Sequence, residues 1–236
     1  MAAASPAPTP RVDNELDLLE ALVPLAGQRI VELGCGAAEL ARALLRRHPD
    51  ASVTGLEVDE RQHAKNLATP QEGLTFVAGG AQAIPLPDAS FDLALMLKSL
   101  HHVPPGSMGE ALAEARRVLR PGGHLYVSEP VYAGALNDVI RLFNEERAVR
   151  AAAQAALDAA LAAGGWTAVA ERRFEVPVRF ADFADFERRT IRVTFAERRV
   201  DAAQLAAIRA AFEAHAGPGG AHFVRPMHAR LLRRAG

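Results

Sequence analysis

The segment VELGCGAAEL, residues 31–40, places two glycines and a carboxylate in a pattern that suits binding of a nucleotide-like ligand. Gly34 and Gly36 follow a short apolar run and precede an alanine-rich one, as in G-x-G turns that bring a helix start to a ligand. A dinucleotide fingerprint would have a third small residue where this chain has Glu39, which is bulky and shares the charge of a pyrophosphate. The turn therefore favours a ligand without phosphate, and a dehydrogenase is a remote alternative.

Two acidic residues could recognise the other parts of such a ligand. Glu32 ends a run that reads as a buried strand, where a lone carboxylate is unfavourable unless a donor or cation meets it. Glu57 ends the next such run, where it could accept hydrogen bonds from both hydroxyls of a ribose. A ligand with an ammonium, a carboxylate, a ribose and no phosphate fits S-adenosylmethionine. Its carboxylate would meet N–H groups at the helix start, and its ammonium would approach Glu32.

Short apolar segments alternate with helical ones in the first half of the chain, which predicts repeated βαβ units. Helices are expected over residues 11–22, 37–48, 59–68 and 109–119, and strands over residues 29–33, 52–58, 74–78, 91–97 and 124–130. The motif RPGG at residues 120–123 is expected to end the last of these helices. Ligands of such sheets bind outside the carboxyl ends of the strands.

The last third of the chain has a different pattern. Residues 134–163 read as helix, residues 164–180 as a turn and a strand, and residues 221–234 as a final strand, antiparallel to its neighbours. A helical insertion is expected over about residues 181–216. We therefore predict an α/β fold of the Rossmann-like, doubly wound type: a mostly parallel sheet with helices on both faces and a C-terminal antiparallel strand.

Composition places the chain among ordinary globular proteins. Half of its residues are apolar and the net charge is −1, which argues against a general nucleic-acid binder. No apolar run approaches the ~20 residues that span a bilayer, and the N-terminus lacks the pattern of a secretory signal. With Cys35 as the single cysteine, no internal disulfide can form, so the cytoplasm is the expected compartment. Residues 1–10 are expected to be a disordered tail and residues 11–236 a single domain.

Five segments, in this order, resemble the motifs of class I S-adenosylmethionine-dependent methyltransferases. They are VELGCGAAELA, VTGLEVD, GGAQAIPLPDASFDLAL, SLHHV and EARRVLRPGGHLYVSEP. The resemblance covers about residues 17–130 and is nearest to the small-molecule set that includes ubiquinone and menaquinone methyltransferases. It implies a cofactor-binding half of about residues 11–130 and a substrate-determining half of about residues 131–236, where the resemblance fades.

The resemblance also implies contacts to the adenine ring. The family often has Asp at the second position of a GDA motif, where this chain has Gly80, and the side-chain oxygen of Gln82 could take its place. The Ala81 N–H could meet the ring, and Val58 could pack on its face. Cys35 is expected to be a small turn residue rather than a nucleophile. The complete predicted cofactor-binding set is Glu32, Gly34, Cys35, Gly36, Glu57, Val58, Gly80, Ala81, Gln82 and Lys98.

His101 and His102 follow the fourth expected strand, at the rim where the transferred methyl group should lie. A neutral histidine can take a proton from an attacking O–H or N–H near pH 7, and by analogy we prefer His102 as this base, with His101 second. Lys98 could approach an anionic acceptor, or extend to solvent. No Asp and Asn set has the spacing of a magnesium site, so no metal is predicted. The candidate acceptor residues are Tyr132, Asn137, Arg141, Phe143 and Arg225.

These features predict an enzyme that moves a methyl group from S-adenosylmethionine to an O, N, S or C atom of a small molecule by in-line displacement. Residues 171–236 hold thirteen arginines against eight acidic residues, which would suit an anionic acceptor. Two alternatives stay open: a regulatory protein that binds the cofactor or S-adenosylhomocysteine without turnover, which Gly80 could indicate, and an RNA or protein methyltransferase. Either a monomer or a homodimer is expected. The abundance of alanine and arginine is typical of a GC-rich bacterial genome.

Overall fold

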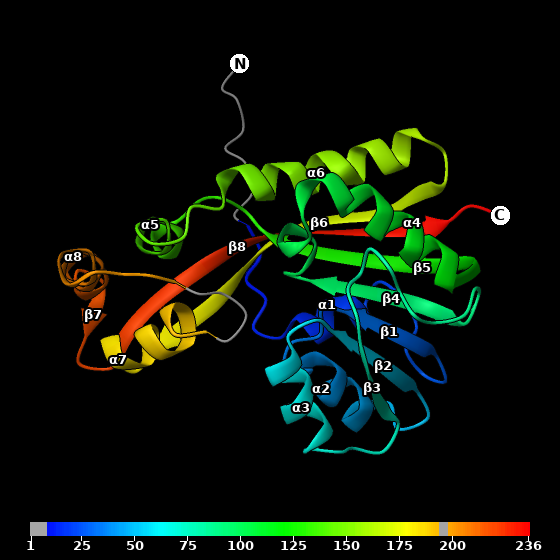
Figure 1. The fold of residues 1–236 in the computed structure, drawn as a ribbon, viewed down its shortest axis with the longest axis horizontal. Helices are drawn as coiled ribbons and strands as arrows, with labels where there is room; N and C mark the ends of the chain where they lie inside the picture. Colours follow the sequence, from blue (N-terminus) through cyan, green and yellow to red (C-terminus); the bar gives the residue numbers. More distant parts are fainter. Residues whose placement is uncertain (1–8, 194–197) are drawn as a thin grey trace.

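Short apolar strands from the first half of the chain pair in parallel. They are β1 (Arg29–Leu33), β2 (Ser52–Glu57), β3 (Leu74–Ala78), β4 (Phe91–Leu97) and β5 (Leu119–Pro130). The structure, a computed structural model, describes residues 9–193 and 198–236, so most of the tail predicted over residues 1–10 lies outside the described part. Within that part the sheet has eight strands, in the order β3-β2-β1-β4-β5-β8-β6, and β7 pairs with β8 (Figure 1).

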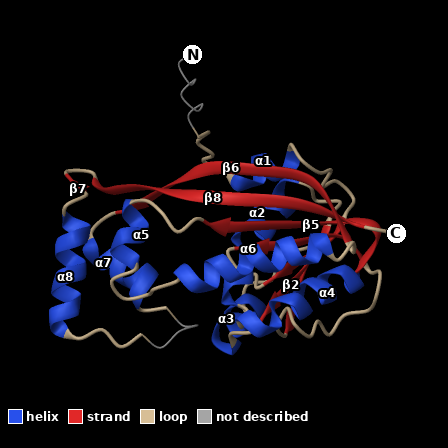
Figure 2. Cartoon of the chain, turned by 90° about the horizontal axis from the view of Figure 1, so that it is seen from above, coloured by secondary structure: helices blue, strands red, loops and turns tan. Residues whose placement is uncertain are grey.

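Helices cover both faces of this sheet because each central strand carries apolar side chains on both of its faces. Leu93 and Leu95 of β4 enter an apolar cluster with α1 (Glu15–Glu20) and α2 (Glu39–Arg47), whereas Ala94 and Met96 enter a second cluster with α4 (Met108–Val118) and α6 (Arg147–Ala162). The helix α3 (Glu60–Leu67) follows β2. Figure 2 shows the two helical layers on opposite sides of the strands. The predicted fold class is therefore confirmed.

The last third of the chain adds two long antiparallel strands to the sheet. β8 (Gly220–Arg234) pairs with β5 on one side and with β6 (Trp166–Phe180) on the other. Because Met227 of β8 lies opposite Pro130, the last residue of β5, the first part of β8 extends beyond the carboxyl edge of the parallel strands. Figure 1 shows this extension of β6 and β8 projecting beyond the other strands toward α7 and β7.

Short helices pack on the β6–β8 extension around a cluster of phenylalanines. The cluster contains Phe180, Phe186, Phe212 and Phe223, whose rings meet mostly edge to face. Within the predicted insertion at residues 181–216, residues 183–191 and 202–213 are helical, residues 192–193 and 198–201 are not, and residues 194–197 lie outside the described residues. The elements around the cluster are α5 (Ala135–Ile140), α7 (Phe183–Phe186), the π-helical turn η3 (Glu187–Ile191), α8 (Ala202–Glu213) and β7 (Ala216–Gly217).

Some boundaries differ from those predicted. α4 ends at Val118 as the RPGG motif requires, but β5 begins at Leu119 and includes that motif. Leu119 pairs with Phe91 and His124 with Leu93, so residues 120–123 form a bulge between two paired parts of the strand. The predicted helix over residues 134–163 is two helices, α5 and α6.

The first helix and two short 3-10 turns complete the description. α1 is shorter than predicted because Asn14 caps it, accepting a hydrogen bond from the Leu16 N–H at 3.1 Å, while Val12 pairs with Glu175 of β6. The 3-10 turns η1 (Leu100–His102) and η2 (Pro105–Ser107) follow β4. No helix in the described residues has both the length and the apolar character needed to cross a membrane.

Candidate functional site

The turn after β1 is built around glycines that no other residue could replace without strain. Gly34 and Gly36 have φ values of +71° and +54°, in the left-handed region. A Cβ atom at Gly34 would also lie 2.9 Å from the Cβ of Ser99. The N–H groups of Gly34 and Cys35 both donate to the Leu56 carbonyl at 2.9 Å, so the turn is fixed to the end of β2.

Cys35 lies buried between this turn and β2. A Cβ atom at Gly55 would come 2.9 Å from its Sγ, so only glycine at that position leaves room for the thiol. Burial, together with the nearby carboxylates Glu32 and Glu57, raises the pKa of Cys35 well above its usual range. The thiol therefore stays protonated, which agrees with a small turn residue and argues against a nucleophile.

Glu57 fixes the same turn through its side chain. It is 7% exposed, and its two carboxylate oxygens accept hydrogen bonds from the Gly36 N–H at 2.7 Å and the Asp59 N–H at 2.8 Å. Each oxygen retains a lone pair, so the carboxylate can still accept bonds from ligand hydroxyls. Val58 beside it is 70% exposed, an unusual position for an apolar side chain next to a buried strand end.

Glu32 is a buried carboxyl group whose hydrogen bonding is incomplete. It is 4% exposed, and its Oε2 atom has no hydrogen-bond partner in the described part of the chain. Burial raises the pKa of Glu32 to about 8, and the Lys98 ammonium opposes this rise only in part. Glu32 is therefore largely protonated at pH 7. A buried polar atom without a partner beside a glycine turn is typical of a site that a ligand completes.

Several N–H groups of the turn before the helix start, where a ligand carboxylate was predicted to bind, already have acceptors within the chain. Those of Gly34 and Cys35 bond to Leu56, that of Gly36 bonds to Glu57, and that of Ala38 bonds to the Cys35 carbonyl at 2.8 Å. Sequence reasoning did not find this arrangement, because it depends on how β2 lies against the turn. It also missed Asn66 of α3, which is buried and donates to the Gly36 carbonyl at 2.7 Å.

The loop after β3 places Gln82 against Gly80. A Cβ atom at Gly80 would lie 2.6 Å from Oε1 of Gln82, so the Gln82 amide occupies the space in which a side chain at position 80 would begin. Ala81 between them is buried. The Oε1 atom of Gln82 therefore lies beside position 80, and its contact with an adenine ring stays a prediction.

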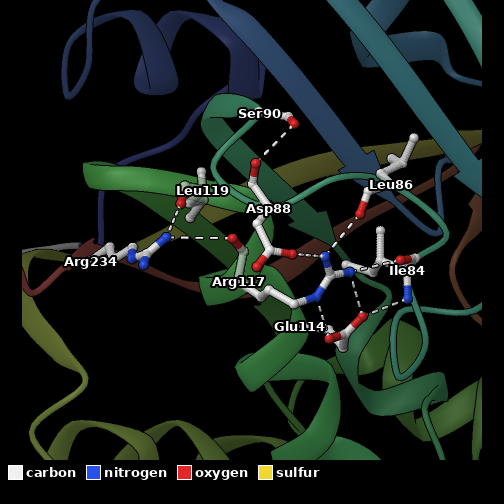
Figure 3. Close-up of polar contacts among 8 residues, drawn as sticks. All are labelled: Ile84, Leu86, Asp88, Ser90, Glu114, Arg117, Leu119 and Arg234. Atoms are coloured by element: carbon white, nitrogen blue, oxygen red, sulfur yellow. Dashed lines mark hydrogen bonds and ion pairs between the residues drawn. The ribbon is translucent and has the colours of Figure 1, made fainter.

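A network of hydrogen bonds around Arg117 of α4 holds the remainder of this loop (Figure 3). The Arg117 guanidinium donates to the Ile84 and Leu86 carbonyls and pairs with Glu114 and Asp88. Because Arg117 has acceptors on three sides, its role is structural, and it fixes the chain that follows Gln82. A hollow of about 450 Å³ beside this network, lined in part by Leu112 and Trp166, lies at the amino edge of the sheet, away from the turn.

The two histidines of η1 differ in their surroundings. His101 is buried, and its Nδ1 hydrogen-bonds the carboxylate of Glu129, which also accepts from the Leu100 N–H at 2.9 Å. The ring of His102 lies 4.1 Å from that of His101, between centroids. His102 is exposed, but desolvation by its surroundings and the neighbouring His101 lower its pKa to about 4, so His102 is neutral at pH 7. Sequence reasoning missed Glu129, although it ends a buried strand as Glu32 and Glu57 do.

Glu146, just before α6, lies beside both histidines. It forms an ion pair with Arg150 at 2.6 Å. Burial would raise the pKa of Glu146, but Arg150 and His101 outweigh burial, so the pKa is lowered and Glu146 is ionised. Nitrogen atoms of the two histidines and an oxygen of Glu146 lie within 4.8 Å of one another, a spacing that could hold a metal ion. The Arg150 guanidinium already pairs with Glu146, and its positive charge opposes the binding of a second cation there.

The predicted acceptor residues fall into two groups. Asn137 is buried and accepts from Arg150 at 3.0 Å, and the Phe143 ring lies under the Arg198 guanidinium at 5.4 Å, so both adjoin the region of Glu146. Arg225 of β8 is within electrostatic reach of Arg150 and Glu146. The structure therefore connects Asn137 and Arg225 with the Arg150–Glu146 pair, and Glu146 lies beside the histidines.

The other two predicted acceptor residues have partners at the surface. The Tyr132 hydroxyl donates to Glu145 at 2.6 Å. Arg141 forms an exposed ion pair with Asp138 at 3.2 Å. These contacts give Tyr132 and Arg141 a local role on the segment between β5 and α6.

Comparison with known proteins identifies relatives of the first half of the chain. Residues 31–127 match the family described as a methyltransferase domain. The 27-O-demethylrifamycin SV methyltransferase of Amycolatopsis mediterranei is 36% identical over 119 residues, which are 48% of this chain and 43% of that protein. The ubiquinone/menaquinone biosynthesis C-methyltransferase UbiE of Paracoccus denitrificans is 34% identical over 120 residues, 48% and 46% of the two chains. This chain thus matches less than half the length of these curated relatives.

Comparison of structures extends the similarity to almost the whole chain. The YcgJ protein of Bacillus subtilis has a TM-score of 0.67 and 18% sequence identity, over 94% of this chain and 98% of that one. At this level of identity the similarity concerns the fold alone. It covers the antiparallel strands and the insertion as well as the segment that the sequence comparison matches.

Proposed function

Because residues 31–127 match the methyltransferase-domain family, we propose that the protein transfers a methyl group from S-adenosylmethionine to a small-molecule acceptor. The observation that carries the proposal is the buried Glu32 carboxyl, whose Oε2 has no partner among the described residues, beside a glycine turn that Glu57 holds in place. The two carboxyl groups match the two ends of this cofactor, the ammonium of its amino acid and the hydroxyls of its ribose. A phosphate-bearing ligand would be repelled by the Glu57 carboxylate, and by Glu32 wherever Glu32 is ionised.

Two further predicted cofactor residues, Lys98 and Val58, can contact other parts of the cofactor in this proposal. Lys98 is exposed and within electrostatic reach of Glu32, so we assign it to the carboxylate of the cofactor, since the N–H groups of Gly34, Cys35 and Gly36 are already bonded. The exposed Val58 side chain would cover one face of the adenine ring.

In methyl transfer, the protein mainly aligns the acceptor and excludes water. When bound, S-adenosylmethionine supplies a methyl group that is already activated on its sulfonium. The chain's contribution is to hold the acceptor atom in line with that group and to remove its proton. The bond between His101 and Glu129 supports His101 as the proton acceptor, because it orients the ring and stabilises its protonated form. His102, preferred on sequence analogy, is the second candidate.

Calorimetric titration followed by a methyl-transfer assay tests the proposal. We expect both S-adenosylmethionine and S-adenosylhomocysteine to bind, and radiolabelled methyl groups to pass to a compound in a panel of small alcohols, phenols, amines and carboxylic acids. Failure of both ligands to bind at millimolar concentration would refute the proposal. Tight binding with no transfer to the small molecules, to RNA or to protein would instead favour the regulatory alternative.

Binding of S-adenosylhomocysteine at pH 7 should release about one proton from Glu32. The raised pKa of about 8 means that the unliganded protein holds a proton there, and the ligand's ammonium requires the ionised carboxylate. Affinity should therefore increase as pH rises towards about 8 and level off above it. Calorimetry in buffers of different ionisation enthalpy measures the release, and Glu32→Gln serves as the control that should show none. Buffer-independent heats in the wild type would contradict the assignment.

Gln82→Ala should weaken binding of S-adenosylhomocysteine by roughly three- to tenfold, the value of one hydrogen bond to adenine. The sharper measurement uses S-inosylhomocysteine, in which an oxygen replaces the adenine amino group. The wild type should prefer the adenine ligand, whereas the variant should bind both alike. Equal discrimination by the two proteins would show that Gln82 does not replace the family's Asp at Gly80.

Several further features belong to this proposal. We assign cofactor binding to the half of about residues 11–130 and acceptor binding to the half of about residues 131–236, within one domain. The arginine excess after residue 170 supports an acceptor with negative charge. The single, buried Cys35 suits the reducing bacterial cytoplasm.

A further inference from the structure

Arg225 lies on the part of β8 that extends beyond the carboxyl edge of the parallel strands. Its neighbour two residues along, Met227, pairs with the last residue of β5, so Arg225 lies just past the end of that strand. Arg225 is partly buried, and the structure gives its guanidinium no hydrogen bond or ion pair with any described residue. Burial and the nearby Arg150 lower the pKa of Arg225, which means that its charge is poorly compensated.

The other partly buried arginines of β8 have partners, which makes Arg225 an exception. Arg230 has a side chain only 12% exposed and pairs with Asp158 of α6 at 2.7 Å. Arg234 donates to the Leu119 carbonyl (Figure 3). Charges that are partly buried in proteins are often paired, so a guanidinium without a partner among the described residues, at a ligand-binding edge, indicates that a ligand supplies the anion.

The charges around Arg225 also favour an anion. Glu146 is the acidic group that acts on it, and the ion pair with Arg150 already neutralises Glu146. The positive potential of Arg150 and Arg189 adds to that of Arg225. Glu146 also lies beside His101 and His102, so an anion held by Arg225 would be close to the rim where the acceptor must lie.

We propose that Arg225 binds an anionic oxygen group of the methyl acceptor, of the carboxylate or phosphate class, and so positions the acceptor at the histidine rim. This inference rests on the proposed methyl transfer and adds its substrate class. A guanidinium presents paired N–H donors that match two oxygens of one carboxylate or phosphate. Arg225 is thus a specificity-determining residue, since neutral acceptors of the same shape would leave it unpaired.

The test compares anionic and neutral probes on protein saturated with S-adenosylhomocysteine. The probes are acetate, benzoate, octanoate and inorganic phosphate, with benzamide and octanamide as neutral counterparts, and binding is followed by NMR titration. We expect at least one anion to bind better than its neutral counterpart, and Arg225→Gln to weaken that binding by about tenfold or more. Arg225→Lys keeps the charge without the paired donors and should recover part of the lost anion binding. Arg230→Gln, which removes a paired arginine from the same strand, should change the affinity for the anion by less than about twofold.

The outcomes separate this inference from the proposed function. Loss of S-adenosylhomocysteine binding by the wild type would count against methyl transfer itself. Intact cofactor binding with no anion bound, or equal losses in Arg225→Gln and Arg230→Gln, would overturn only the role of Arg225. If Arg225→Gln lowers the melting temperature, Arg225→Met distinguishes a packing role, because it restores packing without restoring anion binding. A preference for phosphate over the carboxylates would assign the source of the anion.

Discussion

Glu57→Ala should weaken binding of S-adenosylhomocysteine by about 10- to 100-fold, or roughly 1–3 kcal/mol, the usual loss when charge-assisted hydrogen bonds are removed. Two effects contribute. The ligand loses the acceptor for its ribose hydroxyls, and the turn loses the bonds from Gly36 and Asp59 that hold its shape. Titration calorimetry on the purified variant measures the change.

Matched variants separate these two effects. Glu60→Ala removes an exposed carboxylate from the start of α3 and should leave affinity unchanged. A ligand that lacks one ribose hydroxyl should bind the wild type more weakly, but should bind Glu57→Ala about as well as the full ligand, because the partner of that hydroxyl is already gone. If Glu57→Ala lowers affinity equally for both ligands relative to the wild type, Glu57 shapes the turn and the ribose binds elsewhere.

The sequence predicts the parallel sheet well because local pattern and tertiary environment agree there. β3 and β4 match their predicted bounds because buried strands in βαβ units are short, apolar and separated by clear turns. The RPGG motif shows where local pattern fails. It ends α4 as predicted, yet residues 120–123 remain in β5 because pairing with β4 resumes after them. That outcome depends on a neighbouring strand rather than on the motif.

In the candidate site, too, some residues can be predicted from local sequence and others depend on tertiary contacts. Glu32, Glu57 and the two glycines can be found from sequence because each stands at a strand end or a turn with a recognisable spacing. Glu129 ends a strand too, but its contact with His101 depends on how η1 folds back. Glu146 and Arg225 are 79 positions apart and come within electrostatic reach of each other only because β8 extends over the edge of the sheet. Such contacts are fixed by topology, so sequence patterns alone do not indicate them.

His101→Asn should lower kcat by about 10²- to 10⁴-fold for an acceptor that must lose a proton, the usual contribution of a positioned general base. The affinity for S-adenosylhomocysteine should change little, because His101 faces Glu129 and Glu146 rather than the glycine turn. Glu129→Gln should reproduce part of the loss, since the amide can still orient the ring but no longer stabilises its positive charge. Single-turnover methyl transfer measures the chemical step directly.

His102 provides the contrasting case. Because its pKa is lowered to about 4, a His102 base would be deprotonated over the neutral range, and activity would fall only as pH drops through about 4. Replacing Glu129 would move that limb to still lower pH, because the Glu129 carboxylate is one of the charges that raise the pKa of His102. If His101 is the base, Glu129→Gln should lower kcat more than His102→Asn does, because the His101 ring loses the carboxylate that stabilises its protonated form, and His102→Asn should lower kcat by less than about tenfold. A large loss of kcat in His102→Asn with little loss in Glu129→Gln would assign the base to His102 instead.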